Sequence, residues 1–232
     1  MAAGHHVTAL HYPARGAPLA ALVLGHGAGA GQTSALMTGM AEGLSARGLH
    51  VVTFNFLYTE RGRKLPDPQP LLESCFRAVL HHAAADPLAG VLPLFIGGKS
   101  MGGRMASHVA ASRDAGDESP RAWWTALRGL VFLGYPLHSP ARPQQVRVSH
   151  LARVDRPMLF VQGEKDAFGT PAELRPFLDV LPAPCTLHAV AQAGHSLDVL
   201  KRSGLSQQSI LDEVMDVIAG WIRRTCDAAA TA

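Results

Sequence analysis

Short apolar runs, separated by segments with helical spacing, are the feature that most constrains the fold of this 232-residue chain. Six runs recur at a steady interval, at residues 19–24, 51–54, 92–96, 130–133, 158–161 and 186–190. They are almost continuously hydrophobic, which is typical of strands covered on both faces. Between them, apolar residues return every three or four positions, as Ile210, Val214 and Trp221 do, and such stripes predict amphipathic helices.

This alternation predicts an α/β fold with a mostly parallel central sheet and helices on both faces. An additional edge strand is expected at residues 7–12. The length and the 47% hydrophobic content suit one core, so we expect a single domain over residues 1–232. Three irregular stretches, 56–70, 112–123 and 135–150, are predicted to be long loops. The first and the third follow strands, so they emerge at the edge of a parallel sheet where ligands bind.

The charge and the cysteines exclude several classes of protein. A formal charge of +3, spread along the chain, is too small and too dispersed for a nucleic-acid interface. No apolar stretch is long enough to span a membrane and no signal peptide is recognisable, so we expect a cytoplasmic protein without a membrane partner. The three cysteines lack metal-ligand or disulfide spacing. His5-His6 and His81-His82 lack a third ligand nearby in sequence and are interpreted as surface residues.

The stretch FIGGKSMGGR, residues 95–104, fits two kinds of site. Gly98-Lys99-Ser100 resembles the end of a phosphate-binding loop. That loop needs a glycine five positions before its Gly-Lys pair, and Pro93 occupies this position. The residues that follow Pro93 are apolar strand residues, so the phosphate interpretation is rejected.

The alternative is the G-x-S-x-G turn, which presents a nucleophilic serine between a strand and a helix. Gly98, Ser100 and Gly102 fit it, with an apolar run directly before and a helical stripe directly after. A serine hydroxyl needs a base and an acid to activate it. The loop after the strand expected at 158–161 offers Asp166 as the acid, with Glu164 as the alternative, and the loop after the strand expected at 186–190 offers His195 as the base.

An acyl-transfer site also needs donors for a developing oxyanion. We expect the amide of Met101 to supply one donor and the amide of Ala28, in the glycine-rich loop GHGAGAG at residues 25–31, to supply the other. The same loop fits a dinucleotide-binding pattern, but that site requires an acidic residue after the next strand. Asn55 stands there instead.

The motifs LGHGAGAG, GGKSMGGR, GYPLH, LFVQGEKDAFGT and AGHS occur in an order that resembles the α/β-hydrolases. Within them the chain is similar to small lidless bacterial hydrolases grouped near the dienelactone hydrolases. The resemblance implies the α/β-hydrolase fold without a separate cap domain. It also implies Ser100 as nucleophile, Asp166 as acid, His195 as base, and no cofactor. Dienelactone hydrolases use a cysteine nucleophile, so lactone specificity does not carry over directly.

The expected activity is cleavage of a small-molecule acyl ester through an acyl-enzyme intermediate. Thioesters and lactones are alternative substrates. Similar folds also serve as subunits of chromatin complexes, so a non-catalytic interaction module remains the rival from another class. His26, Tyr135 and His138 are further candidates for the pocket wall, and His26 is also expected to fix the glycine loop through hydrogen bonds. The oligomeric state is left open by the sequence.

Overall fold

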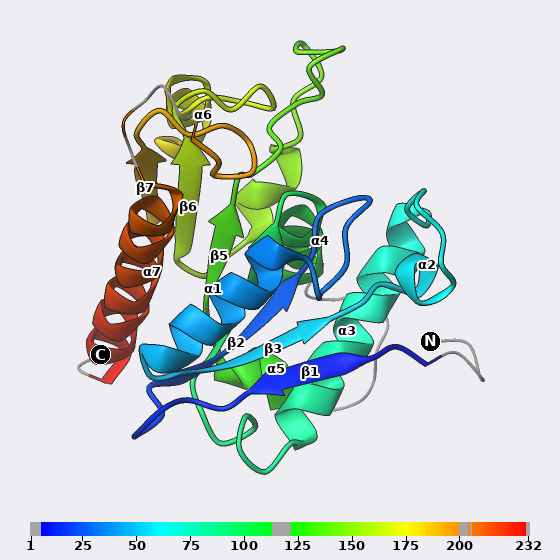
Figure 1. Ribbon diagram of the computed structural model, residues 1–232, viewed down its shortest axis with the longest axis vertical. Helices are drawn as coiled ribbons and strands as arrows, with labels where there is room; N and C mark the ends of the chain where they lie inside the picture. Colours follow the sequence, from blue (N-terminus) through cyan, green and yellow to red (C-terminus); the bar gives the residue numbers. More distant parts are fainter. Residues whose placement is uncertain (1–5, 113–121, 200–203, 205, 231–232) are drawn as a thin grey trace.

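The computed structural model describes residues 6–112, 122–199, 204 and 206–230 (Figure 1). Its centre is a seven-stranded sheet with the order β1-β3-β2-β4-β5-β6-β7. The strands are β1 Ala9–Tyr12, β2 Ala20–Gly25, β3 Leu49–Phe54, β4 Leu94–Lys99, β5 Leu127–Leu133, β6 Met158–Gly163 and β7 Cys185–Val190. Only β1, at one edge, runs antiparallel to its neighbour. The predicted mostly parallel sheet is therefore confirmed.

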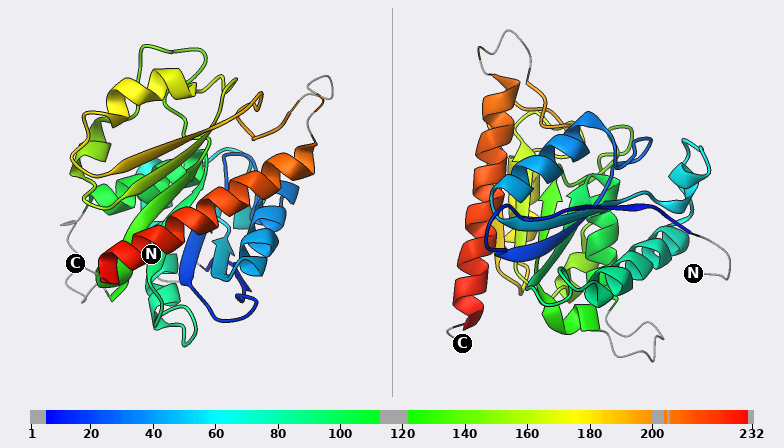
Figure 2. Two further views of the ribbon diagram at one scale, coloured as in Figure 1. Left: turned by 90° about the vertical axis from the view of Figure 1, so that its left-hand side faces the viewer. Right: turned by 60° about the horizontal axis from the view of Figure 1, so that its bottom comes forward.

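Helices cover both faces of this sheet (Figure 2). The helices α1 Ala35–Ala46 and α7 Gln207–Ala230 pack on one face, and α3 Gln69–Ala85 and α4 Met101–Ala111 pack on the other. Shorter helices are α2 Leu57–Glu60, α5 Ala122–Ala126, α6 Pro171–Leu178 and the 3-10 helix η1 Ser149–Arg153. The described residues form no separate cap domain over the sheet.

The two faces bury two separate apolar clusters, and β2 shows how the sequence produces them. All six β2 residues are buried. Ala21 and Val23 join the cluster under α3 and α4, whereas Leu22 and Leu24 join the cluster under α1 and α7. Side chains alternate between the faces of a strand, so a strand inside two layers must be apolar throughout. Each large side chain buried in this way contributes about 1.5–3 kcal/mol.

The structure corrects several predicted boundaries. The strand expected at 92–96 begins at Leu94, because Pro93 has no amide hydrogen to donate, although its carbonyl accepts from Ala21 N at 2.9 Å. β1 begins at Ala9 rather than at residue 7. The stretch 56–70 contains α2, and the stretch 135–150 ends in η1. Most of the loop expected at 112–123 lies outside the described residues.

The topology places the candidate site. The chain passes from β2 to β3 on one side and from β4 to β5 on the other side, so the connections after the neighbouring strands β2 and β4 lead in opposite directions. This arrangement opens a crevice at the carboxyl ends of the strands, where open α/β sheets bind ligands. Among the described residues, no helix is both long and apolar enough to cross a membrane.

Candidate active site

Ser100 stands on a strained turn between β4 and α4. Its backbone has φ 48° and ψ −110°, which few residues other than glycine adopt. Such a conformation costs about 1–3 kcal/mol and persists only where surrounding contacts impose it. Here the Ser100 amide donates to Leu133 O at 3.0 Å, and the Ser100 carbonyl accepts from Arg104 N at 3.0 Å. The turn thus lifts the hydroxyl out of the end of the sheet.

Two glycines make this turn possible because β2 passes very close to it. A Cβ atom at Gly98 would lie 2.1 Å from the Gly25 carbonyl oxygen, and a Cβ atom at Gly102 would lie equally close to the same oxygen. Gly98 also has φ 151°, which side chains disfavour. The glycines of the G-x-S-x-G pattern are therefore required by backbone packing against β2.

Ser100, His195 and Asp166 form a continuous chain of hydrogen bonds. His195, in the loop after β7, has its Nε2 atom 2.8 Å from Ser100 Oγ. Its Nδ1 atom lies 2.9 Å and 2.8 Å from the two oxygens of Asp166. Because a carboxylate accepts hydrogen bonds, Nδ1 carries the proton and Nε2 is left to accept from the serine hydroxyl. This tautomer is the one that a general base next to a nucleophile requires.

The structure separates the two candidate acids. Asp166 is 1% exposed and contacts the imidazole. Glu164 is exposed, and its Oε2 atom accepts from the amide of Gln192 at 3.0 Å. The carboxylate that holds His195 is therefore that of Asp166, which was favoured from the sequence.

Sequence reasoning missed two residues that hold Asp166 and His195. The fully buried Gln162 amide donates to Asp166 Oδ2 at 2.8 Å and to Gly169 O at 2.6 Å. Phe168 donates its backbone N–H to Asp166 Oδ1 at 2.8 Å, and its ring stacks on His195 at 4.2 Å. Gln162 was detectable in principle, because a glutamine at the end of an apolar strand needs buried partners.

His26 orients the glycine-rich loop after β2. Its Nδ1–H donates to Gly27 O at 2.8 Å, and its Nε2 accepts from Phe56 N at 3.2 Å. Burial lowers the pKa of His26 by desolvation, so the neutral ring that makes both bonds is favoured. In a trans peptide the N–H points opposite to the C=O. With Gly27 O turned toward His26, the Ala28 N–H points to the other side of the loop.

The two predicted oxyanion donors border Ser100. Met101 is the first residue of α4, where amides lack intrahelical acceptors. Within the described part of the chain, the amides of Ala28 and Met101 have no hydrogen-bond acceptor. Ala28, Met101 and Ser100 line one common hollow. The arrangement can stabilise negative charge on an oxygen next to Ser100 Oγ.

Ser100 lies between two hollows of different character. The first has a volume of about 370 Å³ and is bordered by His195 and by the apolar side chains of Leu36, Met37 and Phe168. The second has a volume of about 240 Å³ and is bordered by polar side chains, namely Asp67, Gln69, Arg104 and Arg147. We name them the apolar hollow and the polar hollow.

Arg104 and Arg147 give the polar hollow a positive charge. Neither guanidinium group has a hydrogen-bond or ion-pair partner among the described residues, whereas Asp67 pairs with Arg63. Desolvation, together with the charge of Arg147, lowers the pKa of Arg104 below its usual range. An anionic group in this hollow would therefore gain two unused donors.

Lys99 is buried beside the serine turn, with only 6% of its surface exposed. Its stem packs near the glycine loop, where a Cβ atom on Gly27 would lie 3.4 Å from Lys99 Cγ. Its Nζ atom has no hydrogen-bond partner among the described residues. Desolvation lowers the pKa of Lys99 to about 8, although the charges of Asp166 and Asp198 act in the opposite direction. The stem of Lys99 therefore packs beside the serine turn, and its ammonium group pairs with no carboxylate among the described residues.

Three expected pocket residues do not line either hollow. Tyr135 is fully buried and donates its hydroxyl to Arg147 O at 2.7 Å, so it supports the strand-to-loop segment behind the polar hollow. His138 faces α6, with Nε2 3.5 Å from Glu173 Oε1. His26 lies behind the glycine loop, as described above. The expectation for the pocket wall is corrected because sequence spacing does not reveal on which side of a loop a side chain lies.

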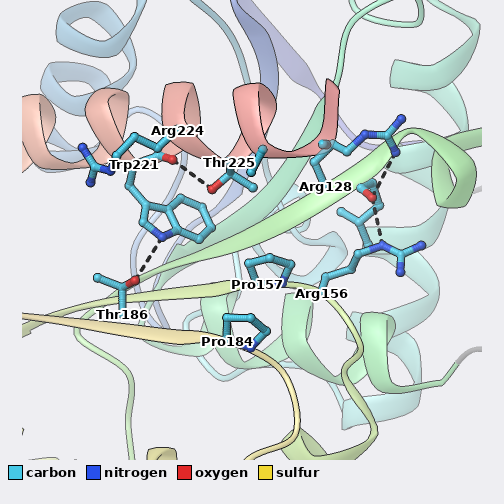
Figure 3. Close-up of a pocket in the computed structure, with 11 residues that line it drawn as sticks. Arg128, Arg156, Pro157, Pro184, Thr186, Trp221, Arg224 and Thr225 are labelled. Atoms are coloured by element: carbon cyan, nitrogen blue, oxygen red, sulfur yellow. Dashed lines mark hydrogen bonds between the residues drawn. The ribbon is translucent and has the colours of Figure 1, made fainter. Parts of the chain in front are cut away.

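The largest hollow described, about 710 Å³, lies away from Ser100 (Figure 3). It is bordered by Arg128, Arg156, Trp221 and Arg224 near the amino ends of β5 to β7, under the last turns of α7. Trp221 donates to Thr186 Oγ1 at 3.2 Å across this region. Ser100 lies at the opposite end of the strands, where β4 leads into α4.

Comparison with known proteins agrees with this geometry. Residues 18–223 match the family described as alpha/beta hydrolase domain. The fold is similar to a dienelactone hydrolase from Anabaena variabilis, with a TM-score of 0.71, 21% identity, and 97% of this chain and 94% of that chain covered. It is also similar to a lidless serine hydrolase from Xanthomonas campestris, with a TM-score of 0.66, 18% identity, and 94% and 88% covered.

A serine hydrolase homologue from Coxiella burnetii gives a TM-score of 0.68 at 16% identity, with 94% of this chain and 90% of that chain covered. At these identities the structural likeness concerns the fold alone. The family match spans nearly the whole sheet and includes Ser100, Asp166 and His195. The chain therefore belongs to the alpha/beta hydrolase family.

Proposed function

We propose that this hydrolase cleaves a carboxylic ester through an acyl-enzyme intermediate on Ser100. The observation that carries the proposal is the hydrogen-bonded chain from Ser100 Oγ through His195 to Asp166, with separations of 2.8 Å and 2.8 Å. A hydroxyl is a poor nucleophile unless a base removes its proton, and this arrangement supplies the base and orients it.

In the acylation step, His195 takes the proton from Ser100 Oγ as Oγ attacks the acyl carbonyl carbon. The carbonyl oxygen becomes an oxyanion, which the amides of Ala28 and Met101 stabilise. Asp166 stabilises the imidazolium and keeps it oriented. His195 then gives its proton to the leaving alkoxide oxygen as the ester C–O bond breaks.

In the deacylation step, water replaces the alcohol. His195 removes a proton from the water, which attacks the acyl carbon, and Ser100 Oγ leaves with that proton. Loss of one oxyanion donor in such sites lowers the rate by about 10²–10³. His26 is expected to act only through the orientation of Ala28, which makes it a positioning residue.

The two hollows suit two chemically different parts of one substrate. The apolar hollow suits an uncharged acyl or alcohol group. The guanidinium groups of Arg104 and Arg147, which have no partner among the described residues, favour an anionic group in the polar hollow. The proposed substrate class is therefore a small ester that carries a carboxylate or another anion. Thioesters and lactones that carry the same charge are alternative substrates, because Ser100 Oγ would attack their acyl carbonyl carbon in the same way.

The test is hydrolysis of chromogenic p-nitrophenyl esters with acyl chains of graded length. The wild-type protein should release p-nitrophenol, and Ser100→Ala should lower kcat/KM by about 10³-fold or more without loss of folding. Ser112→Ala is the matched control, because its hydroxyl only donates to His108 O at the end of α4. Equal rates for the two variants would contradict the proposal, and a folded wild type without any turnover would favour the interaction module.

A further inference from the structure

Three side chains with metal-ligating atoms converge at the edge of the sheet opposite to Ser100. His11 lies on β1, His50 lies on β3, and Asp86 directly follows α3. Their nearest ligand atoms all lie within 4.8 Å of one another. We propose that His11, His50 and Asp86 form a binding site for a divalent transition-metal ion, with zinc as the best-matched metal.

The fold brings these residues together from three separate elements. β1 runs antiparallel to β3, and His11 is the register partner of Val52. His50 precedes Val52 by two positions, so both histidines project from the same face of the sheet. That face is covered by α3, whose end carries Asp86. Because the sequence separations are large, spacing alone did not reveal the cluster.

The distance between the two imidazole groups matches a shared metal. His11 Nδ1 lies 3.3 Å from His50 Nε2. Two nitrogens bound to one tetrahedral zinc ion at 2.0–2.1 Å are separated by about 3.3 Å. Asp86 Oδ2 lies 4.0 Å from His11 Nδ1. A small rotation of the carboxylate would bring Oδ2 as close to His11 Nδ1 as the two ring nitrogens are to each other. Facing ring nitrogens require either a shared proton or a cation between them.

Asp86 is already oriented for this role. Its Oδ1 atom accepts from the amides of Leu88 and Ala89, both at 2.9 Å. These bonds fix the carboxylate and leave Oδ2 directed at the histidines, as hydrogen bonds around metal ligands commonly do. His50 is 3% exposed, so its ring is held in place by the surrounding core.

The donor set determines which metal fits. Two imidazoles and one carboxylate suit zinc, cobalt or nickel, whereas magnesium and calcium prefer oxygen ligands alone. The ring of His82 lies 5.9 Å from that of His11 and one helical turn before Asp86, so it is the nearest side chain for a fourth position. His82, interpreted from the sequence as a surface residue without partners, is exposed but borders this cluster.

A metal at this point would tie the edge strand β1 to β3 and α3. The three ligands come together only in the folded chain, so binding would stabilise the fold in proportion to the logarithm of the metal concentration. The site is independent of the proposed hydrolase activity, because its ligands lie at the other end of the sheet.

The test uses tag-free, chelator-treated protein and zinc chloride, with binding measured by calorimetric titration and by metal content after dialysis. The wild type should retain one zinc ion per chain and show a rise in Tm with zinc concentration. His11→Gln and Asp86→Asn should weaken zinc binding by at least about tenfold. Asp86→Asn keeps an oxygen acceptor for the two amides, so it preserves the turn after α3.

His188→Gln is the matched control. His188 lies on β7, at the opposite edge of the sheet, and its Nε2 atom is 3.1 Å from Glu213 Oε1 on α7. It should bind zinc as the wild type does. Equal zinc affinity in the wild type and in both ligand variants would overturn the proposal, since the ion would then be held elsewhere. Absence of zinc binding to the wild type would also overturn it and would leave a simple hydrogen bond between the two rings.

Discussion

At the scale of single residues, Lys99 carries the clearest energetic conflict in the site. Its ammonium group is buried without a hydrogen-bond partner among the described residues, and its pKa falls from 10.5 to about 8. In the unfolded chain the amine keeps its proton up to the higher value. Below pH 8 the folded protein therefore bears the full cost of a buried charge, and this cost declines as the pH rises from 8 to 10.5.

Lys99→Met is expected to raise the free energy of unfolding at pH 7 by roughly 1–3 kcal/mol, since a shift of this size corresponds to about 3 kcal/mol before solvent relaxation. The gain should shrink at pH 9.5. Urea unfolding at the two pH values measures it. Lys165→Met, at an exposed lysine, should change stability by less than about 0.5 kcal/mol at either pH. A pH-independent gain in Lys99→Met would contradict this account.

Arg104 is expected to bind the anionic group of the substrate in the polar hollow. If the polar hollow binds an anion, Arg104→Met should lower kcat/KM for the p-nitrophenyl monoester of glutaric acid by about tenfold, which corresponds to one charge-assisted hydrogen bond. The uncharged p-nitrophenyl valerate, of equal chain length, should be affected much less. Arg223→Met, at an exposed position on α7, is the control. Equal losses for the two esters would indicate a purely structural role of Arg104.

The residues that could be predicted from the sequence share one property. Ser100, Asp166 and His195 each follow an apolar run, and the carboxyl ends of parallel strands meet at one edge of the sheet. Arg147 could not be assigned, because its role depends on the direction of its side chain in a loop that has no periodicity. Tyr135 was misplaced for the same reason.

At the scale of elements, α4 and η1 are joined by a pair of stacked histidines. The rings of His108 and His150 lie 3.6 Å apart and almost parallel, at 12°. His150 Nε2 also lies 2.8 Å from Ser107 Oγ. Burial lowers the pKa of His150 to about 3 and that of His108 to about 4, and the nearby charges of Arg104 and Arg153 add to both shifts.

These lowered pKa values predict acid sensitivity of the α4 and η1 contact. The unfolded chain binds these protons near pH 6.5, the ordinary value, whereas the folded chain binds them only near pH 3 or 4. The contribution of these neutral rings to the free energy of unfolding is therefore fully present above pH 6.5. It decreases as the pH drops below 6.5, by up to about 1.4 kcal/mol per pH unit for each ring.

His150→Gln keeps a partner for Ser107 and removes the titrating ring. Between pH 7 and pH 5 it should therefore lose about 2 kcal/mol less than the wild type, as measured by urea unfolding. His188→Gln, at the partly exposed histidine of β7, should follow the wild type. The same loss in His150→Gln and in the wild type would show that the stacked pair does not determine acid stability.

Interior elements were predicted more accurately than peripheral ones, for a physical reason. β2, β4 and β6 are buried along their whole length and begin with continuous apolar runs, because both of their faces are covered, and this signal is local. The short helix α2 opens an irregular, charged stretch, and two of its four residues, Leu57 and Tyr58, are buried against neighbouring elements. Pro93 shifted the start of β4, an effect that hydrophobicity alone does not indicate.

At the scale of the whole molecule, the sheet separates two groups of chemically active side chains. The loops at its carboxyl end carry Ser100, Asp166 and His195. The opposite end carries the histidine cluster at β1 and, near the end of α7, the arginine-lined hollow (Figure 3). This separation predicts that the metal-ligand variants leave ester hydrolysis unchanged and that the Ser100 variant leaves zinc binding unchanged.

The most direct test of the central claim is covalent labelling with a fluorophosphonate, followed by mass spectrometry of the intact protein and of its peptides. One adduct per chain is expected, located on Ser100, lost in Ser100→Ala and formed far more slowly in His195→Gln. A folded wild-type protein that stays unlabelled, or that is labelled on another serine, would contradict it.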